Sequence, residues 1–311
     1  MLKGPLLMLA GIGQFSLLDA ISKSLSADHG VWQVLLVRFV TILLAVGVLR
    51  LVAPGWGGGL RTARPGLHAL RAVMMLGSAI SFFMAFSHLP LAEGYLVFFT
   101  SPFFVLALSA ATLKEVPPRA AWLWVGVGFG GVAIGLAPGL LGGLGGSLVG
   151  YGWALAGTLF YSAVFVLNRG LRGERGFMSL MVWPALLGLA VMLWPGIATW
   201  VPPTPLSLGL MMVNGLLVAL ATVSLAFAFR HATAARLAPF GYSGLVWSVT
   251  LDLVLFGRAP GLAMLAGAVI VVAACVMSER AGQKPSGKSC DPSGRSGSRV
   301  ADKTAASGRT P

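Results

Sequence analysis

Apolar residues follow one another along this chain in runs of about 20, separated by short polar or glycine- and proline-rich segments. An apolar stretch of about 18 residues or more is typical of a transmembrane helix, because that length crosses the hydrocarbon core of a bilayer. The pattern therefore predicts ten transmembrane helices. They are expected near residues 5–25, 32–53, 66–88, 91–112, 119–138, 148–168, 177–198, 207–229, 233–256 and 261–279.

Composition excludes a water-soluble globular fold. Hydrophobic residues make up 57% of the 311 residues, and charged residues only 10%. A soluble domain carries roughly 25% charged residues, because its surface must be covered with polar atoms. We therefore predict an all-α integral membrane protein, in which short connections make neighbouring helices antiparallel.

The basic residues are distributed unevenly between alternate connections, although the formal net charge is +13. Arg61, Arg119 and Arg172 lie after the second, fourth and sixth predicted helices, whereas the connections 139–147 and 199–206 carry no charge. Because basic residues accumulate on the cytoplasmic side, both termini are expected in the cytoplasm and the chain in the bacterial inner (plasma) membrane. Helix orientation accounts for the charge, so no nucleic-acid partner is expected.

A weak internal repeat appears at an offset of 143 residues, which pairs Ala85 with Ala228 and Phe86 with Phe229. Each predicted half has five helices, an odd number, so the second half must enter the bilayer inverted. Inverted repeats place the substrate site between the halves in many transporters.

The predicted domain organisation follows from this repeat. Residues 1–138 form the first five-helix repeat and residues 148–279 the second, joined by the glycine-rich connector 139–147. Residues 280–311 are rich in Ser, Gly, Lys and Arg, and such a segment buries too little apolar surface to fold. They are expected to form a disordered basic tail.

Several motifs resemble those of the drug/metabolite transporter superfamily, specifically its EamA-like ten-helix carriers. The motifs are Leu-Ala-Pro-Phe-Gly-Tyr-Ser-Gly-Leu-Val-Trp at 237–247, Leu-Phe-Gly at 255–257 with Pro260, Leu-Pro-Leu-Ala-Glu at 89–93, Ser101-Pro102 and Lys-Glu-Val-Pro at 114–117. The resemblance covers residues 5–279. It implies two inverted five-helix halves, a central cavity and carriage of amino acids, vitamins, nucleoside-like compounds or similar solutes. This chain departs from the pattern at Asp252, where a small residue is common, and at Arg258, where Glu is usual.

Ionisable residues inside the predicted spans are the first candidates for function. Each costs roughly 2.5–3.5 kcal/mol at the centre of a helix on insertion scales, so it is expected to face protein or water. Asp19, Lys23, Arg38, Glu93 and Asp252 are all expected in the outer third of the membrane. In one interpretation they form a substrate clamp or gate at the outer mouth of the cavity, and Asp19 and Arg38 are then the main candidates. In the other they form contacts that hold the helix bundle together.

Aromatic residues are the second set of candidates, because planar solutes stack on aromatic rings. Tyr95 and Tyr242 also bring hydroxyl groups, and Trp247 lies in the motif above. Tyr95, Tyr242 and Trp247 are therefore predicted to shape the pocket. Aromatic side chains at helical spacing also occur as ordinary packing.

Prolines, asparagines and glycines inside the predicted helices are candidates for kinks, interhelical hydrogen bonds and close helix contacts. Pro102 and Pro239 are predicted to kink their helices, because proline removes a backbone hydrogen bond. Asn168 and Asn214 are candidates either for hydrogen bonds between helices or for contacts with solute. Small residues of the fifth predicted helix, Gly126, Gly130 and Gly131, are expected at close helix contacts.

Enzyme motifs are missing from the sequence, which has no phosphate-binding loop, zinc-spaced His and Cys set or nucleophile elbow. We therefore expect no enzyme, cofactor or metal site. The function predicted is a transmembrane carrier of a small metabolite that works by alternating access, with the lipid bilayer and protons or another coupling ion as further partners. The alternatives are a non-transporting scaffold or sensor that uses its basic tail, and a membrane enzyme acting on lipid-linked substrates.

Overall fold

The computed structural model describes residues 3–55, 58–59, 64–113, 118–142, 148–170, 178–232, 237 and 240–283. Every regular element in these ranges is a helix. The helices are α1 (Lys3–Leu25), α2 (Val31–Val52), α3 (Pro65–His88), α4 (Leu91–Phe98), α5 (Ser101–Leu113), α6 (Arg119–Gly142), α7 (Leu148–Gly170), α8 (Met178–Ala198), α9 (Pro205–His231), α11 (Ser243–Phe256) and α12 (Leu262–Gln283).

Among the described residues, eight helical segments are long and apolar enough to cross a membrane, and one of them, Leu91–Thr112, combines α4 and most of α5. Two further apolar helices, Ser243–Phe256 and Leu262–Ser278, are shorter. Helices suit this environment, because they satisfy their backbone hydrogen bonds internally where no water is present. The chain is thus a multi-pass, all-helical membrane protein.

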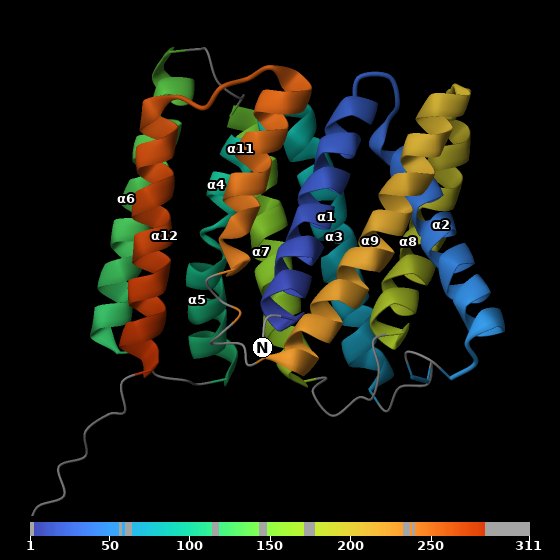
Figure 1. The fold of residues 1–311 in the computed structure, drawn as a ribbon, viewed down its shortest axis with the longest axis horizontal. Helices are drawn as coiled ribbons and strands as arrows, with labels where there is room; N and C mark the ends of the chain where they lie inside the picture. Colours follow the sequence, from blue (N-terminus) through green and yellow to red (C-terminus); the bar gives the residue numbers. More distant parts are fainter. Residues whose placement is uncertain are drawn as a thin grey trace, which may run out of the picture.

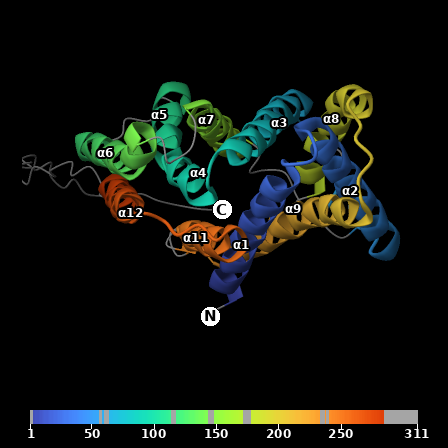
Figure 2. The same cartoon turned by 90° about the horizontal axis from the view of Figure 1, so that it is seen from above.

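The helices lie side by side with their axes roughly along one direction, from the lower to the upper end in Figure 1. Seen from above, they form two rows (Figure 2). One row contains α6, α5, α4, α7, α3 and α8, and the other contains α12, α11, α1 and α9, with α2 packed against α8 and α9 at one end. The first described turn of α1 and the last of α12 lie at the same, lower end (Figure 1).

The main helix contacts join elements that are far apart in the sequence. α1 packs against α9 and α11, and α3 packs against α7 and α8. α2 packs against α8, and α6 against α12. Both rows therefore contain helices from the first and from the second part of the chain.

Local sequence explains where several helices begin and end. Thr204 caps α9 by accepting a 3.1 Å hydrogen bond at Oγ1 from the backbone N–H of Ser207, and Pro205 occupies the first turn, where no N–H is needed. Gly257 ends α11 with a φ of 63°, a left-handed conformation that glycine adopts without a steric penalty.

The segment expected as one helix at 91–112 is broken between α4 and α5, at Phe99 and Thr100. Pro102 is the second residue of α5, directly after the break. Since proline has no N–H to donate, the carbonyl of Phe98 loses the partner that a continuous helix would supply. Pro239, the second predicted kink, lies outside the described residues.

Glycines bring α6 and α12 into close contact. A Cβ atom added at Gly267 would lie 2.5 Å from the carbonyl oxygen of Gly131 and 2.7 Å from Cα of Gly135. The expectation of close packing is confirmed for Gly131 and wrong for Gly126 and Gly130, where an added Cβ meets nothing within 4 Å. Gly126 and Gly130 lie on a different side of α6 from the one that contacts α12.

Two predicted boundaries shift in the structure. α6 continues to Gly142, so helix extends into the connector expected at 139–147. α12 continues to Gln283, past the expected start of the tail at 280. Arg61, Arg172, the remainder of the connector and the tail from 284 onward lie outside the described residues.

Candidate functional site

Asp19 and Tyr95 form a polar contact between α1 and α4. The Tyr95 hydroxyl donates a 2.8 Å hydrogen bond to Oδ2 of Asp19. Asp19 is half-buried, and its Oδ1 has no hydrogen-bond partner among the described residues. One carboxylate oxygen therefore remains available to a ligand.

Tyr95 belongs to a continuous set of rings, which we call the aromatic group. Phe86 stacks on Tyr95 with ring centroids 5.8 Å apart, and Phe98 meets both Tyr95 and Tyr161 edge to face. Tyr242 packs at 5.8 Å against Phe99, which adjoins Phe98. The full group is Phe82, Phe86, Tyr95, Phe98, Phe99, Tyr161 and Tyr242.

The aromatic group thus collects side chains from α3, α4, α7 and the start of α11 around the point where α4 ends. Such edge-to-face and stacked pairs contribute about 0.5–1.5 kcal/mol each beyond the area that they bury. Tyr161 still exposes 38% of its surface. The group provides flat apolar faces beside the free oxygen of Asp19.

Arg38 lies in a junction of three helices, which we call the Arg38 junction. Its Nε donates to Oδ1 of Asn214 on α9 at 2.6 Å, and its Nη2 donates to Oγ of Ser22 on α1 at 2.9 Å. Asn214 in turn donates to the carbonyl oxygen of Leu18 at 2.7 Å. Arg38 exposes 6% of its surface and Asn214 none, so these contacts hold α1, α2 and α9 together inside the bundle.

A second junction, the Arg71 junction, is built from the same two residue types on three other helices. Arg71 on α3 donates through Nε to Oδ1 of Asn168 on α7 at 2.7 Å, and through Nη1 to the carbonyl oxygen of Leu180 on α8 at 3.0 Å. Arg71 exposes 6% of its surface. It therefore ties helices together inside the bundle instead of anchoring the protein at the lipid interface.

Asp252 caps a helix that is not its own. Its Oδ1 accepts from the backbone N–H of Leu91 at 3.1 Å, and its Oδ2 accepts from that of Ala92 at 2.8 Å. Leu91 and Ala92 are the first residues of α4, whose N–H groups have no acceptor within the helix. Asp252 is 1% exposed and fixes α4 to α11.

Two remaining candidates lie apart from these contacts. Glu93 accepts a 2.5 Å hydrogen bond at Oε2 from the hydroxyl of Tyr151 on α7. Trp247 lies against α1, where a Cβ added at Gly13 would be 3.0 Å from the indole ring, and it exposes 39% of its surface. Trp247 has no described ring contact with the aromatic group.

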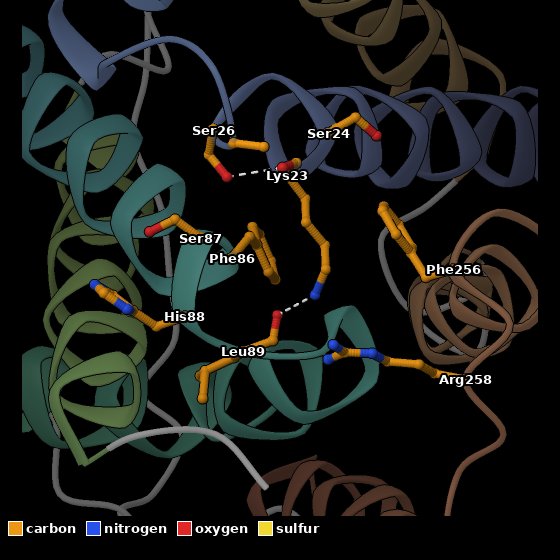
Figure 3. A pocket seen from close by; sticks show the side chains of 10 residues that line it. Lys23, Ser24, Ser26, Phe86, Ser87, His88, Leu89, Phe256 and Arg258 are labelled. Atoms are coloured by element: carbon orange, nitrogen blue, oxygen red, sulfur yellow. Dashed lines mark hydrogen bonds between the residues drawn. The ribbon is translucent and has the colours of Figure 1, made fainter.

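A cavity of about 440 Å³ opens near the upper end of the bundle, where α1, α3 and α11 end. Figure 3 shows Lys23 and Arg258 pointing into it, with the rings of Phe86 and Phe256 beside Lys23. Lys23 donates a hydrogen bond from Nζ to the carbonyl oxygen of Leu89 and lies 5.1 Å from the centroid of the Phe256 ring. The cavity is lined by Lys23, Ser24, Ser26, Ala27, Phe86, Ser87, His88, Leu89, Phe256 and Arg258.

The structure brings some of the predicted site residues together and separates others. Asp19, Tyr95 and Tyr242 are linked through the aromatic group. Asp19 and Arg38 form hydrogen bonds with different partners, although their charges lie near enough to attract each other. Sequence reasoning missed Ser22 and Phe86; the pairing of Phe86 with Phe229 in the repeat was the one signal for Phe86.

Metal binding has no support in the described residues, which contain no group of three or more His, Cys, Asp or Glu side chains placed to hold an ion.

Over most of its length the chain is similar to known proteins that are named as transporters. It is 29% identical over 289 residues to a pseudopaline exporter of Pseudomonas aeruginosa, an alignment that covers 89% of this chain and 96% of the exporter. It is 26% identical over 280 residues to an S-adenosylmethionine uptake transporter of Rickettsia conorii, covering 85% and 90%. A riboflavin transporter of Rhizobium johnstonii is 28% identical over 282 residues, covering 86% and 87%. No family model matches the chain.

The fold has a counterpart among solved structures. A chain titled only as the crystal structure of a protein superposes with a TM-score of 0.64 at 22% identity. The match covers 90% of this chain and 97% of the other. This likeness concerns the fold alone.

Proposed function

We propose that this chain is an EamA-like carrier of the drug/metabolite transporter superfamily, which moves a small metabolite across the bacterial inner membrane by alternating access. The relatives reported above are named as transporters of small metabolites, and not as enzymes, over most of the chain. The multi-pass helical fold agrees with that function.

Helix packing supports two inverted five-helix repeats. If α1, α2, α3, α4–α5 and α6 correspond to α7, α8, α9, α11 and α12, the contact of α1 with α9 corresponds to that of α7 with α3. The contact of α2 with α9 likewise corresponds to that of α8 with α3. The contacts α2–α8 and α6–α12 each join two equivalent helices, so exchanging the two repeats leaves them unchanged. Ten spans and two termini on the same side follow from this proposal, and the distribution of basic residues supports the cytoplasm as that side.

The two junctions fit the same correspondence. Arg71 and Asn214 occupy equivalent positions at the offset of 143 residues, and each contacts the two helices that lead the other repeat. One repeat supplies an arginine where the other supplies an asparagine. The junctions therefore would hold three helices together on each side of the approximate twofold axis while the two sides tilt.

The observation that carries the site is the contact between Asp19 and Tyr95. Asp19 retains one oxygen without a described hydrogen-bond partner and is bonded to a ring of the aromatic group, whereas both oxygens of Asp252 are occupied by backbone N–H groups. Asp19, Tyr95 and Tyr242 are therefore the proposed substrate contacts, and Arg38 and Asp252 are proposed to position the helices that carry them. Coupling to protons or another ion stays a prediction from sequence.

Solute binding and transport in proteoliposomes test this proposal. The purified protein is first screened by thermal shift against a metabolite set that includes S-adenosylmethionine and riboflavin, because a ligand that binds the folded state raises its melting temperature. Counterflow uptake of the strongest stabiliser is then measured for wild type and for Asp19→Asn. We expect uptake to fall about tenfold or more, as loss of one charge-assisted hydrogen bond predicts.

Asp28→Asn is the matched control, since Asp28 is an exposed acid in the connection between α1 and α2. It should transport at the wild-type rate. Full activity of Asp19→Asn at equal expression would remove Asp19 from the site.

A further inference from the structure

The cavity at the upper end of the bundle has two cationic groups and no acid among its lining residues. Lys23 comes from α1, and Arg258 is the second residue after the end of α11. Figure 3 shows both side chains directed into the same space, whereas the His88 ring points away from them. Two like charges that converge in this way repel each other unless an anion lies between them.

The donors of these two groups are only partly used. Lys23 has three N–H donors, and one of them binds the carbonyl oxygen of Leu89. The Arg258 guanidinium has five, the side chain is exposed, and none of these donors has an acceptor among the described residues. The cavity therefore offers several free N–H donors that only an acceptor from outside the described protein can satisfy.

Nearby acids are engaged elsewhere. Asp252 binds the N–H groups of Leu91 and Ala92 with both carboxylate oxygens. Glu93 accepts a hydrogen bond from the hydroxyl of Tyr151. Asp252 lies near enough to attract both cations, and Glu93 near enough to attract Lys23, but neither carboxylate lines the cavity itself.

The backbone after α11 fixes the position of Arg258. Gly257 adopts a φ of 63°, and the N–H of Arg258 donates to the carbonyl oxygen of Asp252 at 3.0 Å. This turn places Phe256 and Arg258 on the same cavity wall. The Phe256 ring lies beneath the Lys23 ammonium. Phe86 lies on the other side of Lys23 but is buried, because it stacks with Phe82 and Tyr95.

We propose that this cavity binds the anionic group, a carboxylate or a phosphate, of the solute that the protein carries, with Phe256 packing against the apolar part of that solute. The inference rests on the proposed carrier function. It also extends that function, because Phe86 stacks on Tyr95, whose hydroxyl binds Asp19. An anion held at Lys23 and Arg258 would thus lie next to the proposed substrate contacts.

Binding of simple probes to the full-length protein tests the proposal. Benzoate and phenyl phosphate carry an anionic group on a ring, and benzamide is the neutral counterpart of benzoate. We expect both anions, and not benzamide, to raise the melting temperature in detergent. Lys23→Gln and Arg258→Gln should each lower the affinity for both anions about tenfold, as loss of one charge-assisted hydrogen bond predicts.

Arg230→Gln is the matched control for loss of a positive charge. Arg230 is exposed at the end of α9, where its guanidinium lies 5.4 Å from the Phe227 ring, and it does not line the cavity. It should leave anion binding unchanged. Equal stabilisation by benzamide and benzoate, or equal benzoate affinity in wild type and both cavity variants, would overturn the proposal.

A lipid headgroup could supply the same phosphate, and vesicles separate this source from a solute. In liposomes of zwitterionic lipid alone, benzoate and phenyl phosphate should still bind. If added anionic lipid stabilises wild type through Lys23 and Arg258 while neither soluble anion binds, the solute proposal is wrong. If the metabolite screen instead finds a transported solute without an anionic group, the carrier function stands and the anion site falls.

Discussion

At the scale of single residues, the polar groups divide into those whose hydrogen bonds hold helices together inside the bundle and those proposed to bond a solute. Arg38 and Asp252 belong to the first kind, because their partners are buried groups on other helices. Asp19, Lys23 and Arg258 belong to the second. Burial and partner identity, more than charge or depth, therefore distinguish proposed substrate contacts from structural ones.

Removing the amide partner of Arg38 should be costly. Asn214→Leu leaves a buried guanidinium with fewer acceptors, and loss of a partner by a buried donor costs about 1–3 kcal/mol, or more when the group is charged. We expect a clear drop in melting temperature in detergent. The double variant Arg38→Met with Asn214→Leu removes both polar groups and should recover much of the loss; a double variant as unstable as the single one would contradict this account.

At the scale of elements, α4 depends on a cap that another helix supplies. Asp252→Ala leaves the N–H groups of Leu91 and Ala92 without their acceptors, and loss of a cap costs about 0.5–2 kcal/mol. The melting temperature should fall, and hydrogen exchange should accelerate at the start of α4. Thr204→Ala removes the cap of α9 and is the comparison, since its effect should stay within α9.

The contact between α6 and α12 makes a second prediction at this scale. Gly267→Ala places a methyl group 2.5 Å from the carbonyl oxygen of Gly131, so the helices must separate. We expect a loss of about 1–3 kcal/mol, typical of overpacking, seen in thermal unfolding. Gly126→Ala adds the same methyl group to the open side of α6, and an equal loss there would show that the contact is not the cause.

Sequence predicted the all-helical membrane fold, because a long apolar run is stable in lipid as a helix, but it did not predict the break between α4 and α5. It placed Asp19 and Arg38 near one depth in the membrane but could not assign their partners. Tyr95 lies 76 residues from Asp19 along the chain, and Asn214 lies 176 residues from Arg38. The hypothesis that Asn168 and Asn214 bond between helices is confirmed. Which glycines of α6 meet a neighbour depends on helix rotation, which the apolar pattern of a helix hydrophobic on all sides does not specify.

At the scale of the whole molecule, the predicted orientation places residues 61 and 172 on the cytoplasmic side and residue 27 on the other. Single cysteines at these positions, with Cys275 and Cys290 both replaced, can be labelled by an impermeant maleimide. We expect Ala27→Cys to react in intact spheroplasts, and Arg61→Cys and Arg172→Cys only after permeabilisation. Labelling of residues 61 and 172 from different sides would refute the inverted arrangement.

The basic tail supplies the last prediction. A chain ended after Gln283 keeps every described contact of α12, so it should carry the stabilising metabolite at the wild-type rate in proteoliposomes. Loss of transport at normal expression would instead favour a protein that works through its tail.

The pairing of early helices with late ones has a consequence for synthesis. A ribosome makes the chain from its first residue onward, so Arg38 enters the membrane long before Asn214 exists, and α1 waits for α9. A product that stops midway keeps a guanidinium in lipid with one of its acceptors missing. Incomplete chains therefore expose polar groups to the bilayer, which distinguishes them from finished molecules and makes them targets for membrane proteases.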